Sequence, residues 1–594
     1  MRLRSFPFIL FVFASASLAG LHAPASDAAE APRQFAQAAP AEGGPRAPRR
    51  LPIPESAARA QNLPGVDLTP GLLYEILAAE ILAQRGGAAA ALAKYLELAQ
   101  RTRDPRIAQR AVEIALFERN SAKALEAAQI WAETDPQSLE ARQALVNLYI
   151  GAGRAEEALP HMEQLLSAES TNVAEGFIQI NRLLSARATD RKASLSIIQR
   201  LAARYPRVAE AHAAVAQAAF NAGEEDLALR EARAAAELRP EWDFPVLMSA
   251  QILSRRDGAR ASAELKSFLE RNPGSSEVRM AYARSLVAER KYGDARGEFQ
   301  RIEQDFPDNA DVLYALGLLA LDARDYASAE SSLKRLLSRE PRDPNLVYLY
   351  LGQVAEEQKK YAEAREWYAR IASGDQYLQA QSRFARSLAR EGRIADARAH
   401  LQGLVATSNQ QRVQIIMSEA QLLREANRNR EAFEVLEKGA LRLPNHPDLL
   451  YDLAMAAEKV ERLDVLENNL KKVIELKPDH AHAYNALGYT LADRNMRLTE
   501  ARDLIEKALK IAPDDAMIID SMGWVMYRLG DLPRALELLK RAYTLMPDAE
   551  IGAHLGEVLW QSGQRAEADR VWAEAAGKAP DNETLRNTIR RFKP

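Results

Sequence analysis

The sequence predicts an all-α superhelical solenoid of about fifteen helical hairpins, because two residue types recur along it about every 34 positions. An alanine returns once in most units, at Ala124, Ala158, Ala228, Ala261, Ala295, Ala329, Ala364, Ala397, Ala432, Ala501, Ala535 and Ala568. A proline closes most units, at Pro136, Pro206, Pro240, Pro273, Pro307, Pro341, Pro444, Pro478, Pro513, Pro547 and Pro580. The chain has 594 residues and is 47% hydrophobic. A repeat array suits this length, because a single core stops growing at roughly 250–300 residues, whereas an array adds core one unit at a time.

The first 28 residues have the pattern of a secretory signal peptide. Arg2 and Arg4 precede a short apolar run over 6–12, and small residues follow over 14–20. A basic head, an apolar middle and a small-residue tail are typical of an export signal. The alternative, a retained membrane anchor, is disfavoured because the apolar run is too short to span a bilayer. We therefore expect an exported protein that is located in the periplasm. One version of this hypothesis also associates it with the outer membrane.

A lipid anchor needs a cysteine that this chain does not have. Leu18, Ala19 and Gly20 match the start of a bacterial lipoprotein box, yet Leu21 stands where the lipid-bearing cysteine would be. The whole sequence contains no cysteine. Membrane association is therefore left open by the sequence.

Residues 29–66 are predicted to form a disordered linker. The segment is rich in Ala, Pro, Gln and Arg and shows no helical period. Its prolines remove backbone donors and disfavour helix in the residues before them: Pro32, Pro40, Pro45, Pro48, Pro52, Pro54 and Pro64.

The unit 310–341 shows how one repeat is read as a hairpin. Its first helix carries an apolar stripe at i, i+3, i+4 and i+7: Leu313, Leu316, Gly317 and Ala320. Residues 324–326 form the turn, and Pro341 ends the second helix. Gly317 and Ala329 are small because the two helices cross closely, so a larger side chain is expected to cost roughly 1–3 kcal/mol.

Small residues at the eighth and twentieth positions, with proline near the thirty-second, are typical of the tetratricopeptide repeat. We place the array over 67–582 and a capping segment over 583–594. Ser194 and Leu466 stand where alanine is expected, and the units ending near Glu169, Gln376 and Asn409 lack the closing proline. These places are candidates for a bend between sub-arrays, or for tolerated drift of the repeat.

Composition argues against several classes of function. The 79 basic and 82 acidic residues give a net charge of −3, so no basic excess supports nucleic-acid binding. His480 and His482 form the one tight histidine pair, with no third ligand nearby in the sequence for a metal. We found no phosphate-binding loop and no paired acid and base. The sequence therefore predicts no enzyme activity, no cofactor and no metal site.

Four aromatic residues near the C-terminal end are candidates for partner binding. In the last three repeats, the positions predicted to face a concave groove include Tyr489, Trp524, Tyr527 and Trp560. Aromatic side chains are enriched at binding hot spots. The alternative is that these rings pack against the neighbouring hairpin.

The two ends of the array carry more specific segments: Leu-Thr-Pro-Gly-Leu-Leu-Tyr over 68–74, Asp-Ser-Met-Gly-Trp-Val-Met-Tyr-Arg-Leu-Gly over 520–530, and Ala-His-Leu-Gly-Glu-Val-Leu-Trp over 553–560. With them, the chain resembles a proteobacterial family of exported tetratricopeptide proteins. The resemblance implies the role known for that family, an adaptor, usually a lipoprotein, of a periplasmic carboxy-terminal processing protease. Such an adaptor binds the protease, activates it and helps to deliver cell-wall hydrolases.

Two functional hypotheses follow. The first is a non-catalytic periplasmic scaffold that binds a processing protease and presents envelope or cell-wall hydrolase substrates. The alternative is a tetratricopeptide assembly component of an exopolysaccharide or secretion machine. Both expect proteins as partners and exclude nucleic acid.

Overall fold

The computed structural model describes residues 66–168, 172–187 and 190–593, and these residues contain helices and no strand. The predicted signal peptide and nearly all of the predicted linker lie outside the described residues. Clustering of contacts divides the chain into two compact units, one ending at Leu319 and the other beginning at Ala320. No helix in the described part of the chain is long and apolar enough to cross a membrane.

The first unit contains α1 to α14 and most of α15. The helices are α1 (Pro70–Gln84), α2 (Ala88–Thr102), α3 (Pro105–Phe117), α4 (Ser121–Thr134), α5 (Leu139–Gly151), α6 (Ala155–Ser167), α7 (Val173–Arg187), α8 (Arg191–Ala202), α9 (Ala209–Ala222), α10 (Glu225–Leu238), α11 (Asp243–Leu253), α12 (Gly258–Arg271), α13 (Ser276–Ala288), α14 (Tyr292–Asp305) and α15 (Ala310–Asp322).

The second unit contains the end of α15 and α16 to α31. The helices are α16 (Tyr326–Leu337), α17 (Pro344–Glu357), α18 (Tyr361–Ala369), α19 (Tyr377–Arg390), α20 (Ile394–Gln402), α21 (Asn409–Glu425), α22 (Asn429–Arg442), α23 (Pro447–Lys459), α24 (Leu463–Leu476), α25 (Ala481–Asp493), α26 (Leu498–Ile511), α27 (Ala516–Arg528), α28 (Leu532–Leu545), α29 (Ala549–Gln561), α30 (Arg565–Lys578) and α31 (Glu583–Phe592).

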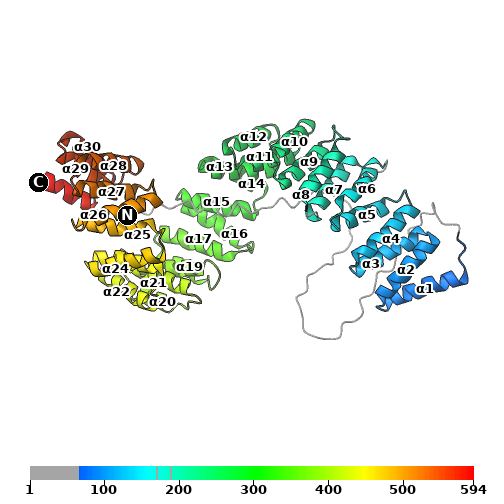
Figure 1. Cartoon of the computed structure of the whole chain (residues 1–594), viewed down its shortest axis with the longest axis horizontal. Coiled ribbons are helices and arrows are strands. Elements are labelled where there is room, and N and C mark those ends of the chain that lie inside the picture. The colour runs from blue at the N-terminus through cyan, green and yellow to red at the C-terminus, as the bar shows by residue number, and fades with distance from the viewer. Residues whose placement is uncertain (1–65, 169–171, 188–189, 594) are drawn as a thin grey trace. The chain divides into compact units, whose positions relative to one another are not determined.

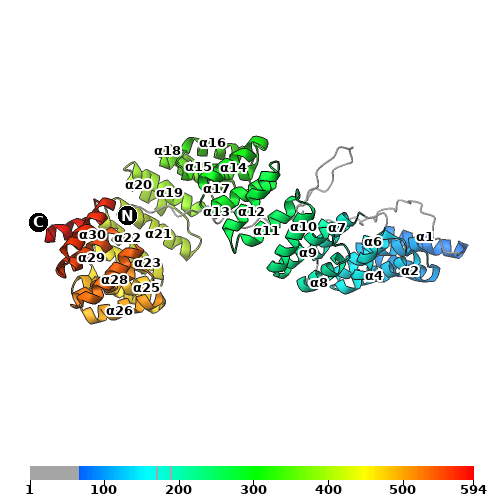
Figure 2. The same cartoon turned by 90° about the horizontal axis from the view of Figure 1, so that it is seen from above.

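Consecutive helices pair as hairpins, and within each unit successive hairpins lie side by side (Figure 1). The hairpins α25–α26, α27–α28 and α29–α30 stack in this order (Figure 1), and the helices α25, α26, α28, α29 and α30 lie together when seen from above (Figure 2). Among the described residues, seven such pairs, α1–α2 to α13–α14, lie in the first unit and seven, α17–α18 to α29–α30, lie in the second, and α31 packs on the last pair, mainly against α29. The prediction of an all-α solenoid of about fifteen hairpins is confirmed.

Local sequence explains where these helices begin and end. At the start of α27, the Asp515 side chain accepts hydrogen bonds from the backbone N–H groups of Met517 and Ile518, at 2.9 and 3.1 Å. This satisfies two of the donors that a helix leaves free at its N-terminus. After α27, Gly530 adopts a φ of 91°, which glycine reaches without steric penalty. A turn then leads directly into α28.

The core lies between the helices of each hairpin and between neighbouring hairpins. Small residues allow this close approach: a Cβ added at Gly488 would lie 2.6 Å from Cγ1 of Ile505, and one at Gly523 would lie 2.7 Å from Cγ of Leu539. Ala501 and Ala535, the paired alanines of these hairpins, are fully buried. The reason predicted for small residues at both positions therefore applies in these hairpins.

The division between the two units does not coincide with any of the irregular repeats, so a bend at Gln376 or Asn409 stays a prediction, and Glu169 lies outside the described residues. The boundary between the two units falls inside α15, because its first turns pack with α13 and α14 through Val312, Leu316 and Leu319. Of the residues that replace the expected alanine, Leu466 is buried in the core of the second unit. Ser194 is also buried and donates its hydroxyl hydrogen to the Asp190 carbonyl oxygen, at 2.9 Å. Both substitutions therefore fit inside a regular hairpin.

Candidate functional site

The four predicted partner-binding residues lie on the first helices of the last three hairpins, α25, α27 and α29. Trp524 is only 4% exposed, and its ring stacks on His554 with centroids 4.3 Å apart. Tyr489, Tyr527 and Trp560 are half-buried. The structure therefore places Trp524 in the packing between hairpins, as the core-packing alternative expects. Partner binding by the other three residues stays a prediction.

A buried ion pair joins α27 to α29 beneath these rings. Nδ1 of His554 lies 2.9 Å from Oδ2 of Asp520, and both side chains are nearly inaccessible to solvent. The Tyr489 hydroxyl lies 3.4 Å from Nε2 of the same histidine, so all three first helices meet at His554. Burial works to lower the pKa of His554, but the Asp520 carboxylate outweighs it and raises that pKa. The pair therefore favours a charged histidine inside the array.

A second buried acid connects α29 to the capping helix. Glu557 accepts hydrogen bonds from the Tyr527 hydroxyl at 3.3 Å and from the Arg591 guanidinium of α31. Burial raises the pKa of Glu557, and the nearby Arg591 only partly opposes this. Tyr527 is therefore held by a hydrogen bond at its hydroxyl and by Trp524 beside its ring, with centroids 5.2 Å apart.

The last aromatic group is built on α29, α30 and α31. Trp560 stacks on Trp572 with ring centroids 5.6 Å apart, and Phe592 of α31 lies against both rings. The guanidinium of Arg565 is 5.1 Å from the Trp560 ring centroid. Trp560 therefore presents a partly exposed aromatic edge among cationic side chains, an arrangement that suits aromatic or acidic groups of a partner.

Among the described residues, no three histidine, cysteine or acidic side chains are grouped to hold a metal. The Trp524 indole N–H has no hydrogen-bond partner in the described structure, although the atom is buried. His480 and His482, the one tight histidine pair in the sequence, act elsewhere: His480 caps α25, and His482 lies 3.9 Å from Asp515.

Sequence reasoning missed the charged residues under the aromatic rings. One signal could have revealed them, since Asp520 and His554 are 34 residues apart and so are Glu557 and Arg591. Opposite charges at this spacing occupy equivalent positions in successive repeats. They are therefore expected to meet across neighbouring first helices.

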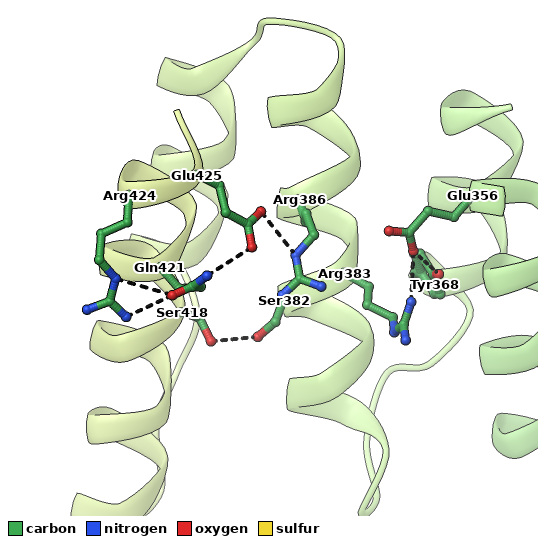
Figure 3. A network of polar contacts seen from close by, with 9 residues as sticks. All are labelled: Glu356, Tyr368, Ser382, Arg383, Arg386, Ser418, Gln421, Arg424 and Glu425. Atoms are coloured by element: carbon green, nitrogen blue, oxygen red, sulfur yellow. Dashed lines mark hydrogen bonds and ion pairs between the residues drawn. The ribbon is translucent and has the colours of Figure 1, made fainter. Parts of the chain in front are cut away.

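Polar contacts also link first helices earlier in the second unit (Figure 3). Glu356 of α17 accepts hydrogen bonds from Tyr368 at 2.8 Å and from Arg383 of α19 at 2.9 Å. From α19 the chain of contacts continues to α21 through the hydroxyls of Ser382 and Ser418, 3.0 Å apart. The charges drawn in Figure 3 thus have partners within the array.

Comparisons with known proteins agree with this geometry. Models described as tetratricopeptide repeats match residues 253–319, 314–378 and 451–516. The TPR repeat-containing protein PA4667 of Pseudomonas aeruginosa is 36% identical over 523 residues, which cover 88% of each chain. This chain belongs to the tetratricopeptide repeat family. Tetratricopeptide repeats generally mediate protein–protein interaction, so the coarse function of this array is that of a scaffold for binding proteins.

Other similarities to this tetratricopeptide protein are local. Bacteriophage adsorption protein A of Escherichia coli is 35% identical over 66 residues, 11% of this chain and 7% of that protein. The crystal structure of TTC0263, a thermophilic TPR protein of Thermus thermophilus, covers 30% of this chain and 97% of its own, with 24% identity and a TM-score of 0.28. A tetratricopeptide repeat protein of Parabacteroides merdae covers 47% and 97%, with 16% identity and a TM-score of 0.32.

Proposed function

We propose that this tetratricopeptide protein is a non-catalytic periplasmic adaptor that binds a processing protease and presents envelope or cell-wall hydrolase substrates to it. Two sequence features support the cellular side of the proposal: the export-signal pattern of residues 1–28 and the resemblance of the end segments, including 68–74 and 520–530, to exported adaptors. The absence of a cysteine at position 21 favours an adaptor that is not anchored by a lipid.

The observation that carries the proposal is the row of partly exposed aromatic rings at Tyr489, Tyr527 and Trp560. Each ring is held by contacts to its neighbours: Tyr489 by His554, Tyr527 by Glu557 and Trp560 by Trp572. Rings fixed before binding lose little conformational entropy when a partner docks. Aromatic anchors of this kind supply much of the binding energy at protein interfaces.

The test is to mix the purified mature protein with the processing protease of the same organism and follow cleavage of a cell-wall hydrolase. We expect co-elution and faster cleavage. The double variant Tyr527→Ala and Trp560→Ala is expected to weaken binding at least tenfold, since hot-spot truncations cost about 2 kcal/mol or more. Trp367→Ala is the matched control, because Trp367 is a partly buried ring on α18 that stacks on Tyr348, away from the candidate site.

Two results would contradict the proposal. One is a wild-type protein that neither co-elutes with the protease nor stimulates cleavage. The other is binding to polysaccharide-export or secretion components in the same assay without binding to the protease. Circular dichroism of both variants shows whether helical content is retained, so that a loss of binding is not mistaken for a loss of fold.

A further inference from the structure

A cleft of about 360 Å³ lies in the first unit between α10 and α12, the second helices of two successive hairpins. Its apolar part is formed by Trp242, Val246 and Phe268. Phe268 is buried and forms the floor of the cleft, so the half-buried Trp242 and Val246 supply its accessible apolar surface. This size takes one or two amino-acid residues of a ligand.

Three guanidinium groups line the same cleft: those of Arg233, Arg260 and Arg271. A single acidic side chain, Glu264, lines it with them. Its Oε1 lies 3.5 Å from Arg233 and 3.3 Å from Arg260, so two cations share one carboxylate oxygen. Arg271 donates instead to the Ser267 carbonyl oxygen, at 3.2 Å. The lining therefore has two more positive than negative charges.

A second cleft in the same unit shows that this charge is not a general property of the repeat. About 350 Å³ in volume, it lies between α2 and α4, again the second helices of successive hairpins, with Leu92 and Leu96 as its apolar part. Its charged lining consists of Glu97, Glu118, Glu126 and Lys123, which gives two more negative than positive charges. Two clefts of similar size and position thus differ in the sign of the ligand charge that they suit.

We propose that the α10–α12 cleft binds the carboxy-terminal residue of a client polypeptide whose last side chain is apolar. The carboxylate is received by the guanidinium groups of Arg260 and Arg271, and the side chain packs against Trp242 and Val246. Guanidinium groups pair with carboxylates through two parallel hydrogen bonds, which gives direction as well as affinity. The carboxy-terminal residue joins a carboxylate directly to an apolar side chain, a combination that internal acidic residues do not have. That the bound chain is a protease substrate rests on the proposed function; the binding itself does not.

The test uses the full mature protein and a fluorescein-labelled ten-residue peptide that ends in Ala-Val-Leu with a free carboxyl group. Fluorescence anisotropy is expected to show binding that weakens about tenfold or more when the carboxyl group is replaced by an amide. The same loss is expected for the double variant Arg260→Gln and Arg271→Gln, because it removes both charge-assisted hydrogen bonds to the carboxylate. Lys123→Gln, in the α2–α4 cleft, is the matched control and should bind the peptide as the wild type does.

Arg260 and Arg271 are exposed, so their replacement is expected to leave the fold intact, and a thermal melt checks this. The proposal is overturned if the acid and amide peptides bind equally, or if the arginine variants bind as well as the wild type. It is also overturned if laurate binds in the cleft while the peptide does not, because the site would then take fatty acids. Peptide binding is measured without protease, so its failure is distinct from a failure of the adaptor function.

Discussion

Two buried polar clusters lie one near each end of the array, and each joins three helices. The pKa of a glutamate is lowered in the first cluster and raised in the second. In the N-terminal cluster, Glu80 of α1 accepts hydrogen bonds from Tyr95 of α2 and Arg110 of α3, both at 2.8 Å. In the C-terminal cluster, Asp520 and Glu557 lie with His554, and Arg591 reaches Glu557 from the capping helix.

Two differences act together: the Glu557 side chain is 7% exposed against 23% for Glu80, and the cation beside Glu557 is the more exposed of the two. Burial works to raise the pKa of Glu80, but the donors Arg110 and Tyr95 outweigh it and the pKa is lowered. Burial of Glu557 prevails over Arg591, and its pKa is raised. Arg110 is almost fully buried, whereas the Arg591 side chain is 59% exposed. A cation that is buried with its acid thus stabilises the ionised form more than one that remains in solvent.

The largest effect is expected when the N-terminal cluster loses its cation. Arg110→Ala leaves the Glu80 carboxylate half-buried without its main partner, and breaking such a pair costs about 3–5 kcal/mol. Hydrogen exchange measured by mass spectrometry should show faster exchange across α1 to α3. Lys94→Ala removes a cation of α2 that is 51% exposed and pairs with Glu97, itself 55% exposed, and it is expected to change local stability by less than about 0.5 kcal/mol. Equal effects of the two variants would contradict the buried-pair explanation.

The C-terminal cluster is expected to lose less on a single change. Asp520→Asn keeps a polar side chain near His554 and removes the charge, which should lower the stability of α27 and α29 by about 1.5–3 kcal/mol. The hydrogen-exchange rates of peptides from these helices measure this loss of stability. Asp503→Asn, an exposed acid on α26, serves as the control. A variant that exchanges like the wild type would show that the His554–Asp520 pair contributes no net stability.

A change of packing between α29 and α30 is expected to have an intermediate to small effect on stability. Gly556→Ala would place a Cβ against the indole of Trp572, so the second helix must shift, at a cost of about 1–3 kcal/mol. Gly577→Ala meets nothing within 4 Å and replaces glycine inside α30, so it should stabilise by about 0.5–1 kcal/mol. Opposite shifts of the local unfolding transition are the expected result. Two shifts of the same sign would contradict the close crossing of α29 and α30.

The smallest expected effect is the dependence of stability on pH, and its direction differs between the two clusters. The raised pKa of His554 contributes stability that is present below its unfolded value, about 6.5, and is lost as pH rises through the folded pKa. The lowered pKa of Glu80 contributes stability that is present above about 4.3 and is lost as pH falls through the folded pKa. After correction for intrinsic rates, protection of α27 and α29 should fall as pH rises above about 6.5, while that of α1 to α3 should fall as pH drops below about 4.3. The Asp520→Asn variant should reduce the first trend and leave the second unchanged.

The fold could be predicted from sequence because each repeat is specified locally. Alanine and proline recur at fixed positions, and glycines such as Gly488 and Gly523 mark where helices cross. The same register placed Tyr489, Tyr527 and Trp560 on neighbouring first helices, where the structure has them. It did not predict that Trp524 is covered, because that depends on His554 in the next hairpin.

Other features needed side-chain positions that periodicity does not contain. The contact between Glu80 and Arg110 spans 30 residues, slightly less than one repeat, so counting repeats does not find it. The α10–α12 and α2–α4 clefts are alike in the repeat pattern, and the side chains that line them set the sign of the ligand each suits.

By itself, the sequence determined the class of fold, the number of hairpins and the helices that carry the aromatic rings, because these follow from residues that act within one repeat. Only the tertiary structure decided which rings remain accessible, which charges are buried together and where a cleft combines aromatic and cationic side chains. The physical reason is that burial and electrostatic balance depend on contacts between repeats, and the free energy of a buried charge is set by every neighbour within a few ångströms.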